Sequence, residues 1–131
     1  MNRENLNPDT MAKSHLYTQI VKPARNSQLI FISGQTAIDR EGQIVGKDDF
    51  EKQAIQVFEN IRAALNSVGA TFSNLVKITT YLTAIQNREM LGKVRSRYFD
   101  QNNLPTSTLV EVKSLAHQDY LIEIEAVAAV A

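Results

Sequence analysis

Two acidic residues near the end of the chain are spaced so that their side chains lie together. Glu123 and Glu125 alternate with Ile122, Ile124 and Ala126, and in a β-strand this alternation places the carboxylates on one face and the apolar groups on the other. Such a pattern is typical of a sheet face in contact with water. If another subunit covered that face, a carboxylate there would lose its hydration and could orient or deprotonate a water molecule.

Other residue types that commonly carry chemistry are sparse. Cysteine is absent and the two histidines, His15 and His117, are far apart in the sequence, so no metal site is expected. His117 lies in a polar segment that indicates a surface turn, which favours an exposed loop histidine over a catalytic base. Ser33-Gly34 ends a predicted strand without a following helix, unlike a nucleophile elbow. Glycine-rich phosphate loops are also missing.

A group of basic residues occupies one short segment. Arg88, Lys93, Arg95 and Arg97 fall on a predicted helix, where Lys93 and Arg97 share a face. A solvated helix face is the favoured interpretation. The whole chain has 14 Lys plus Arg and 14 Asp plus Glu, so it carries no net charge that would attract nucleic acid or an anionic membrane. Nucleic-acid binding is therefore disfavoured.

Length and composition indicate one globular domain. The 131 residues are 44% hydrophobic and 21% charged, which suits a single core. We expect one domain over residues 1–131, with residues 1–12 as a flexible lead-in. No apolar stretch is long enough to cross a membrane, and the polar start lacks the pattern of a secretory signal. A cytoplasmic location is expected, and the lack of cysteine fits a reducing compartment.

Hydrophobic periodicity predicts the elements that must position these residues. Strands are expected at 17–21, 29–32 and 43–45, then a helix over 49–68, a strand at 75–82, a helix over 88–99, and strands at 107–112 and 121–130. Asp48 and Glu51 have the spacing of a capping box at the start of the first helix, and Gly69 is expected to close it. The order β-β-β-α-β-α-β-β predicts an α+β fold with a mixed or antiparallel sheet and both helices on one side.

The second face of this sheet has no predicted cover within one chain. The runs 29–32 and 126–131 carry apolar side chains on both faces of their strands. Large exposed apolar sheet surfaces are rare on monomers, and a symmetric copy is the economical way to bury one. We therefore expect the chain to form an oligomer.

Several segments in order resemble the RidA family, also called YjgF or reactive-intermediate deaminases and sometimes labelled endoribonuclease L-PSP. The matching segments, which span nearly the whole chain, are Tyr17–Gln19, Phe31–Gln35, Gln53–Asn60, Val76–Leu82, Pro105 and Ile122–Ala128. The resemblance implies a chorismate-mutase-like α+β fold and a homotrimer with ligand clefts between neighbouring subunits. It also implies hydrolysis, without a cofactor, of imines and enamines released by pyridoxal-phosphate enzymes, giving 2-oxo acids and ammonia.

The resemblance also assigns roles by position. Glu123 matches the family's water-orienting glutamate, and Tyr17 matches the tyrosine that lines the cleft. Ser33-Gly34 matches the strand end that contributes backbone and hydroxyl contacts. This chemistry is physically reasonable, because an iminium carbon is already electrophilic and needs mainly an aligned water and a proton path.

One position departs from the family pattern. The deaminase branch has Pro-x-Arg-Ser after the second helix, and its arginine binds the substrate carboxylate through two hydrogen bonds. This chain has Pro105-Thr106-Ser107-Thr108, so Ser107 stands in place of that arginine, with Thr108 as a further polar candidate. Losing charged hydrogen bonds of roughly 1.5 to 3 kcal/mol would weaken carboxylate-dependent binding about ten- to a hundredfold. Arg95 is a candidate replacement cation, and the plainer interpretation is a surface role.

Three functions follow from these observations. The leading prediction is that the chain binds or hydrolyses a small imine, enamine or carbonyl metabolite in an intersubunit cleft, with standard 2-imino acid deamination in question because of Ser107. A noncatalytic metabolite-binding or regulatory module fits the family cleft and the missing arginine equally well. An endoribonuclease is less favoured, because the charge of the chain is balanced.

Overall fold

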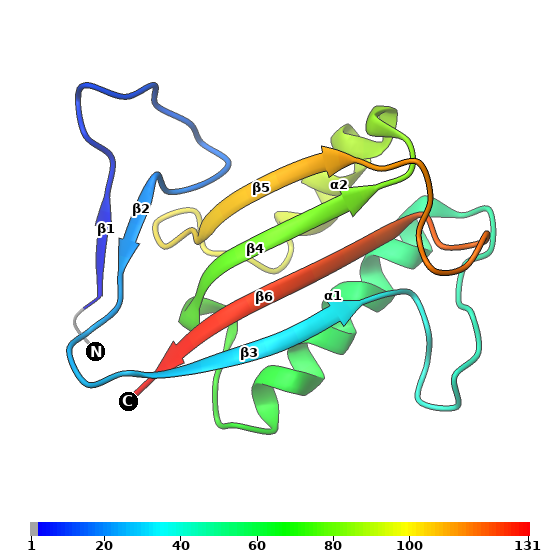
Figure 1. The fold of residues 1–131 in the computed structure, drawn as a ribbon, viewed down its shortest axis with the longest axis horizontal. Helices are drawn as coiled ribbons and strands as arrows, with labels where there is room; N and C mark the ends of the chain where they lie inside the picture. The colour runs from blue at the N-terminus through cyan, green and yellow to red at the C-terminus, as the bar shows by residue number, and fades with distance from the viewer. Residues whose placement is uncertain (1–2) are drawn as a thin grey trace.

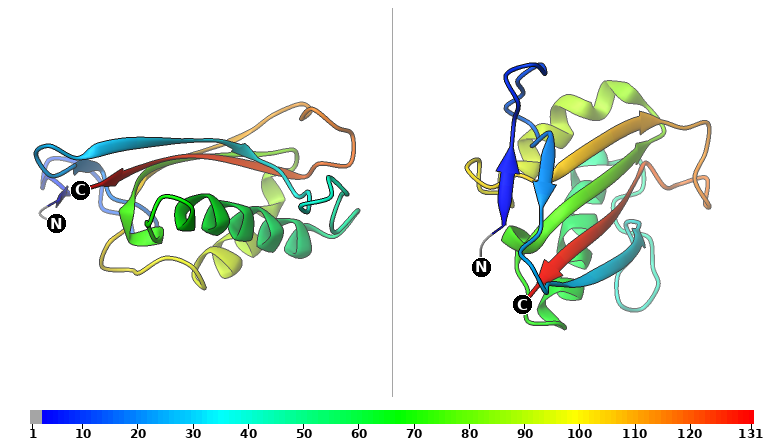
Figure 2. Two further views of the ribbon diagram at one scale, coloured as in Figure 1. Left: turned by 90° about the horizontal axis from the view of Figure 1, so that it is seen from below. Right: turned by 60° about the vertical axis from the view of Figure 1, so that its left-hand side comes forward.

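A four-stranded sheet with two α-helices on one of its faces dominates the computed structural model, which describes residues 3–131 (Figures 1 and 2). The strands are β1 (Glu4–Leu6), β2 (Ile20–Lys22), β3 (Gln28–Gln35), β4 (Leu75–Leu82), β5 (Thr106–Glu111) and β6 (Ile122–Val130). The α-helices are α1 (Phe50–Asn66) and α2 (Arg88–Arg95), and the short 3-10 turns η1 (Phe72–Asn74) and η2 (Ile85–Asn87) precede β4 and α2.

The sheet has the strand order β3-β6-β4-β5 (Figure 1). Strand β6 is antiparallel to both β3 and β4, whereas β4 and β5 are parallel and are joined through α2. The predicted mixed sheet with both helices on one side is therefore confirmed. Its topology places β6, the strand of the two glutamates, between two neighbours, so both of its edges are held by hydrogen bonds.

Helix α1 follows the predicted apolar spacing, but its start differs by one residue. Asp49, not Asp48, is the N-cap: its carboxylate accepts a hydrogen bond from the Lys52 N–H at 3.1 Å. Asp48 has a φ of 58°, so its backbone belongs to the preceding turn. The predicted end is confirmed, because Gly69 adopts a φ of 69° and the following Ala70 N–H returns to the Leu65 carbonyl.

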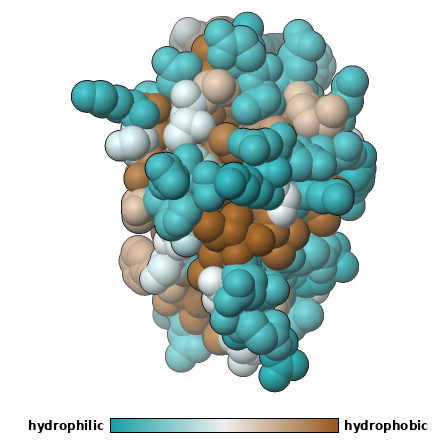
Figure 3. Space-filling model, turned by 90° about the vertical axis from the view of Figure 1, so that its right-hand side faces the viewer, coloured by the Kyte–Doolittle hydropathy of each residue, from teal (hydrophilic) through white to brown (hydrophobic). Residues whose placement is uncertain are grey.

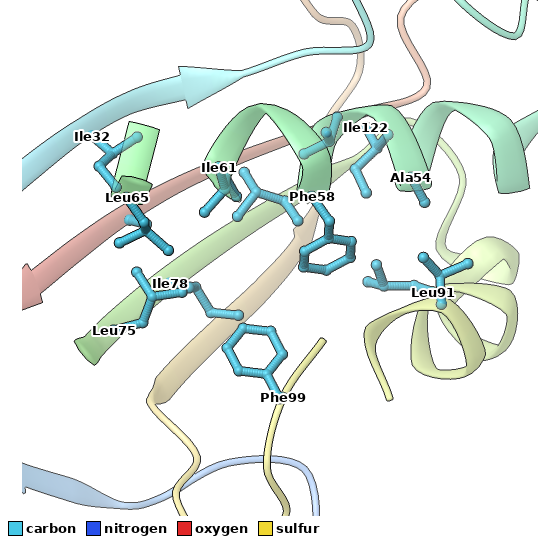
Figure 4. Packing of buried hydrophobic residues seen from close by; sticks show 14 of the residues in the cluster. Ile32, Ala54, Phe58, Ile61, Leu65, Leu75, Ile78, Leu91, Phe99 and Ile122 are labelled. Carbon is cyan, nitrogen blue, oxygen red and sulfur yellow. The ribbon is translucent and has the colours of Figure 1, made fainter. Parts of the chain in front are cut away.

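The core lies between the helices and the inner face of the sheet (Figure 4). It includes Ala54, Phe58, Ile61 and Leu65 of α1, Leu91 and Val94 of α2, Leu75 and Ile78 of β4, Ile122 and Ile124 of β6, and Phe99. Burying one large apolar side chain contributes about 1.5 to 3 kcal/mol. Because Ile122 and Ile124 are fully buried, the inner face of β6 is anchored and its outer face is fixed in orientation.

Strand β4 contains an irregularity that simple alternation does not predict. Alternation places Leu75 on the face opposite Ile78, yet both belong to the core cluster and Leu75 is fully buried. The pairing with β6 shifts register between Leu75 and Lys77. This bulge adds one residue to β4 and returns Leu75 to the inner face, so the predicted orientation of Leu75 is wrong.

The start of the chain is more ordered than predicted. The expectation of a flexible lead-in is wrong for residues 4–6, which form β1 and pair antiparallel with β2. Arg3 donates hydrogen bonds to the carbonyls of Ser73, Leu75 and Leu104 at 2.9, 2.7 and 3.1 Å. The first two residues of the expected lead-in lie outside the described part of the chain.

Two of the predicted strands also need correction. The strand expected at 17–21 is Ile20–Lys22, and the segment 43–45 forms only a single bridge between Ile38 and Ile44. Three strands still precede the first helix, so the order of strands and helices matches the prediction. The additional strand β1 at the start of the chain offsets the absence of a strand at 43–45. Short segments of this kind take their structure from the partner they find, which local sequence does not specify.

The outer face of the sheet carries exposed apolar side chains. Phe31 is 76% exposed and Leu29 is 51% exposed, and both lie on β3. Further apolar surface lies between polar groups at the end of the molecule where β3, β4 and β5 finish and β6 begins (Figure 3). Within one chain nothing among residues 3–131 covers Phe31, as the sequence led us to expect.

Candidate functional site

Strand β6 places the two glutamates on the outer face of the sheet. Glu123 lies opposite Tyr81 of β4, and Glu125 lies opposite Thr79. Ile122 and Ile124, which alternate with them, are fully buried on the inner face. The predicted shared face of the carboxylates is therefore confirmed.

The Glu123 carboxylate lies directly against the backbone of Gly34. A Cβ atom at position 34 would overlap the Glu123 Oε2 atom and would lie 2.8 Å from its Cδ atom. The close approach arises from a register shift between Ile32 and Gln35, where β3 has one residue more than β6. Bulges of this type often occur beside active sites, because they change where a side chain or a backbone group points. Gly34, with Ser33 beside it in the chain, thus lies next to Glu123.

Glu125 has a partner and Glu123 does not. The Tyr81 hydroxyl donates a hydrogen bond to Glu125 Oε1 at 2.7 Å. This hydrogen bond, with some desolvation and the charges of Glu125 and Glu123, raises the pKa of Tyr81. Within residues 3–131, the Glu123 carboxylate makes no hydrogen bond or ion pair. It is therefore the carboxylate that remains available for a water molecule or a ligand.

A shallow cavity of about 450 Å³ lies beside these residues on the outer face. Its lining includes Phe31, Ser33, Lys77, Thr79, Glu125 and Val127. Lys77 Nζ donates a hydrogen bond to Thr79 Oγ1 at 2.8 Å, which places a positive charge in the same hollow. Thr108 pairs with Thr79 across the β4–β5 ladder and so belongs to this face as well.

A second cavity, of about 460 Å³, lies on the helix side of the sheet. It is lined by Leu16, Tyr17, Arg88, Glu89, Leu91, Gly92, Arg95, Ser107 and Leu109. Ser107 lies opposite the core residue Ile78 in the β4–β5 ladder, which explains why it faces the helices. The structure therefore brings three predicted residues together: Tyr17, Arg95 and Ser107.

Arg95 is held in an unusual environment within this second cavity. Its Nη2 atom is buried and has no hydrogen-bond partner. The guanidinium Cζ atom lies 5.1 Å from the centre of the Phe99 ring, which is within range of a cation–π interaction. Burial lowers the pKa of Arg95 from its ordinary value.

The predicted residues thus form two groups that a single chain keeps apart. Glu123, Ser33, Gly34 and Thr108 belong to the outer face, and Tyr17, Arg95 and Ser107 belong to the helix face. Ser107 and Thr108 are neighbours in sequence but face opposite ways, because side chains alternate along a strand. Tyr81, the partner of Glu125, was not predicted. Alternation points it outward, but only the β4–β6 register reveals its contact.

His117, a metal site and a membrane span were the remaining features considered from the sequence. His117 is in an exposed turn, where its Nδ1 atom accepts a hydrogen bond from the Asp119 N–H at 3.0 Å, as predicted for a loop histidine. Across residues 3–131 there is no group of three or more histidine, aspartate or glutamate side chains that could hold a metal ion. In the same range, no helix is both long enough and apolar enough to span a bilayer.

Comparison with known proteins gives the family. The family model described as endoribonuclease L-PSP matches residues 8–130. A RutC family protein of Pyrococcus abyssi is 38% identical over 112 residues, covering 86% of this chain and 84% of the relative. The solved structure of the Rid-family protein YyfB from Yersinia pestis has a TM-score of 0.87 at 29% identity and covers 99% of this chain and 100% of its own. RidA from a Psychrobacter species superposes with a TM-score of 0.72 at 28% identity, covering 97% and 99%.

These matches extend over nearly the whole chain and agree with the fold described above. The chain belongs to the endoribonuclease L-PSP family, within the RidA/YjgF superfamily. The predicted chorismate-mutase-like α+β fold of that superfamily is confirmed.

Proposed function

We propose that this protein hydrolyses a small imine or enamine metabolite, without a cofactor, in clefts between the subunits of a homotrimer. The observation that carries the proposal is the Glu123 carboxylate, which lies against Gly34 with no partner among residues 3–131. A carboxylate held in this way can accept a hydrogen bond from one water molecule and orient it toward an electrophilic carbon.

The proposed reaction is balanced by water alone. The oxygen of the water attacks the iminium carbon while Glu123 accepts a proton. Glu123 then returns the proton to the nitrogen of the resulting amino alcohol. The carbon–nitrogen bond breaks, and Glu123 passes the proton of the hydroxyl group to the departing ammonia. The products are a carbonyl compound and an ammonium ion. An enamine first takes up a proton on carbon to give the same iminium ion.

A cleft between subunits is proposed because one chain holds the two groups of residues on opposite faces of its sheet. If the outer face of one subunit packs beside the helix-side cavity of a neighbour, Glu123 of one meets Tyr17 and Ser107 of the other. The exposed Phe31 supports such packing, since it leaves apolar surface on that outer face. A cytoplasmic location is proposed with it, on the absence of cysteine from the sequence.

A coupled assay of ammonia release from imines generated in situ tests the proposal. Replacing Glu123 by Gln keeps the shape of the side chain and removes the base, so we expect the catalysed rate to fall by about 10²- to 10⁴-fold. Glu41→Gln, in an exposed turn, serves as the matched control and should keep the wild-type rate. If Glu123→Gln hydrolyses imines as fast as the wild type, the catalytic assignment is wrong.

A noncatalytic metabolite-binding module is the second candidate, favoured by Ser107 at the position where the deaminase branch has its arginine. It predicts saturable binding of a carbonyl compound with no ammonia released from any imine. RNA cleavage is a third candidate, motivated by the description of the family and by the basic residues Arg88, Lys93, Arg95 and Arg97. Single-stranded RNA that stays intact with the purified protein at low salt would remove it.

A further inference from the structure

Arg95 differs from the arginines whose partners are visible in the structure. Arg97 forms an ion pair with Glu51 at 3.0 Å, Arg62 approaches Glu59 at 3.7 Å, and Arg3 donates to three backbone carbonyls. In the described part of the chain, Arg95 makes neither an ion pair nor a hydrogen bond, although its Nη2 atom is buried. One nitrogen of a half-buried guanidinium therefore lies away from water without a compensating partner.

Such an arrangement is costly for a residue with only a structural role. A buried charged donor without an acceptor loses its hydration and gains nothing in return. Contact with Phe99 covers the face of the guanidinium but leaves the N–H groups of Nη2, which lie in the plane of the group, unsatisfied. The lowered pKa of Arg95 has the same physical cause, namely burial. An unsatisfied buried group in a native protein calls for an explanation, such as a functional role or a water molecule or ion bound there.

The cavity around Arg95 combines polar and apolar groups. Ser107 and Tyr17 supply hydroxyl groups, whereas Leu16, Leu91 and Leu109 supply apolar surface. Two charged residues of α2, Arg88 and Glu89, also line the cavity, but the Glu89 carboxylate forms no ion pair with Arg95. No carboxylate of the described chain neutralises the guanidinium, so an anion from outside can do so.

We propose that Arg95 is the anion-binding residue of this cavity and that it binds the carboxylate of a substrate with a branched or aromatic apolar side chain. The guanidinium fork matches the two oxygens of a carboxylate, and the apolar part of the substrate lies against Leu16, Leu91 and Leu109. The positive charge that binds the carboxylate thus belongs to Arg95 of α2, whereas Ser107 of β5 supplies only a hydroxyl group. The inference rests on the proposed function, because it names the substrate class of the same site.

Binding of stable product analogues tests the inference without any turnover. The probes are 4-methyl-2-oxopentanoate, its methyl ester and pyruvate, measured by calorimetry on the wild-type protein and on Arg95→Gln. Charged hydrogen bonds of about 1.5 to 3 kcal/mol correspond to roughly ten- to a hundredfold in affinity. We expect the wild type to bind the acid more tightly than the ester by that factor, and Arg95→Gln to lose the difference. Arg97→Gln, which removes an exposed arginine of the same segment, should keep it.

The contact between the apolar lining of the cavity and the substrate side chain is tested by a separate variant. Leu16→Ser should weaken binding of 4-methyl-2-oxopentanoate and leave binding of pyruvate unchanged, whereas Val68→Ser, at another exposed apolar residue, should change neither. Unaltered binding of the acid by correctly folded Arg95→Gln overturns the inference, and so does a wild type that binds none of the probes. Arg95→Lys covers a failure of Arg95→Gln to fold: it keeps the charge without the fork and should bind the acid more weakly than the wild type.

The two proposals can fail separately. If Glu123→Gln keeps full turnover while Arg95→Gln loses selective binding of the acid, the hydrolytic role of Glu123 is wrong and the anion site stands. If Glu123→Gln abolishes turnover while Arg95→Gln binds the acid normally, the anion site is wrong and the hydrolytic role stands.

Discussion

Adding one methyl group at Gly34 should disable the proposed base without unfolding the protein. In Gly34→Ala the new Cβ atom would overlap Glu123 Oε2 and lie 2.8 Å from Cδ, so the carboxylate must move by about 1 Å or more. A misplacement of about 1 Å can reduce a catalysed rate by about 10²-fold. We therefore expect the rate of ammonia release to fall by about that factor.

The stability of the same variant should change little. The atoms in the way belong to the far end of a flexible side chain, and no positive φ restricts position 34. A forced rotamer of Glu123 costs about 0.5 to 1.5 kcal/mol, while Gly→Ala stabilises by about 0.4 to 1 kcal/mol through the unfolded chain. Urea unfolding should thus give a free energy of unfolding within about 1 kcal/mol of the wild type.

A double variant separates this explanation from a general disturbance of the site. Both Gly34→Ala and Glu123→Gln are proposed to act through one carboxylate, so their combination should be hardly slower than Glu123→Gln alone. The reasoning would be refuted by a folded Gly34→Ala protein that releases ammonia at the wild-type rate. It would also be refuted if the two losses multiplied.

Three further predictions concern other parts of the site. Ser107→Arg adds a guanidinium to the cavity of Arg95 and should raise the rate on carboxylated imines about tenfold or more in the ammonia assay. An unchanged rate in the folded variant would mean that this chain lacks more than one group of the deaminase-branch site. Because the pKa of Tyr81 is raised by its hydrogen bond to Glu125, the stability that this bond contributes should be present at neutral pH and be lost as the pH rises above about 10. Tyr81→Phe should lack that alkaline component in urea unfolding at pH 8 and 10.5, and an identical pH dependence in both proteins would contradict the assignment. Phe31→Asp places a charge on the apolar outer face, so sedimentation should show single chains where the wild type sediments as a trimer, and a wild type found only as single chains would remove the proposed cleft.

The sequence alone determined the parts of this fold that depend on local pattern. The apolar spacing of α1, the closing Gly69 and the alternation around Glu123 and Glu125 all reflect periods of 3.6 or 2 residues, which are set by backbone geometry. Ser33-Gly34 and Glu123 could both be assigned to the cleft through the family resemblance, and the structure places Gly34 against Glu123. The one-residue difference at the N-cap shows the limit of such patterns, since Asp48 and Asp49 offer the same chemistry.

The tertiary structure decided which residues meet. The bulges of β3 and β4, the strand β1, and the contact of Tyr81 with Glu125 all depend on pairing with segments far away in sequence. The β4–β5 register turned Ser107 toward the helices and Thr108 toward the outer face, and the packing around α2 buried the Nη2 atom of Arg95 without a partner. Register and burial are properties of contacts between segments, and a local pattern carries no information about them.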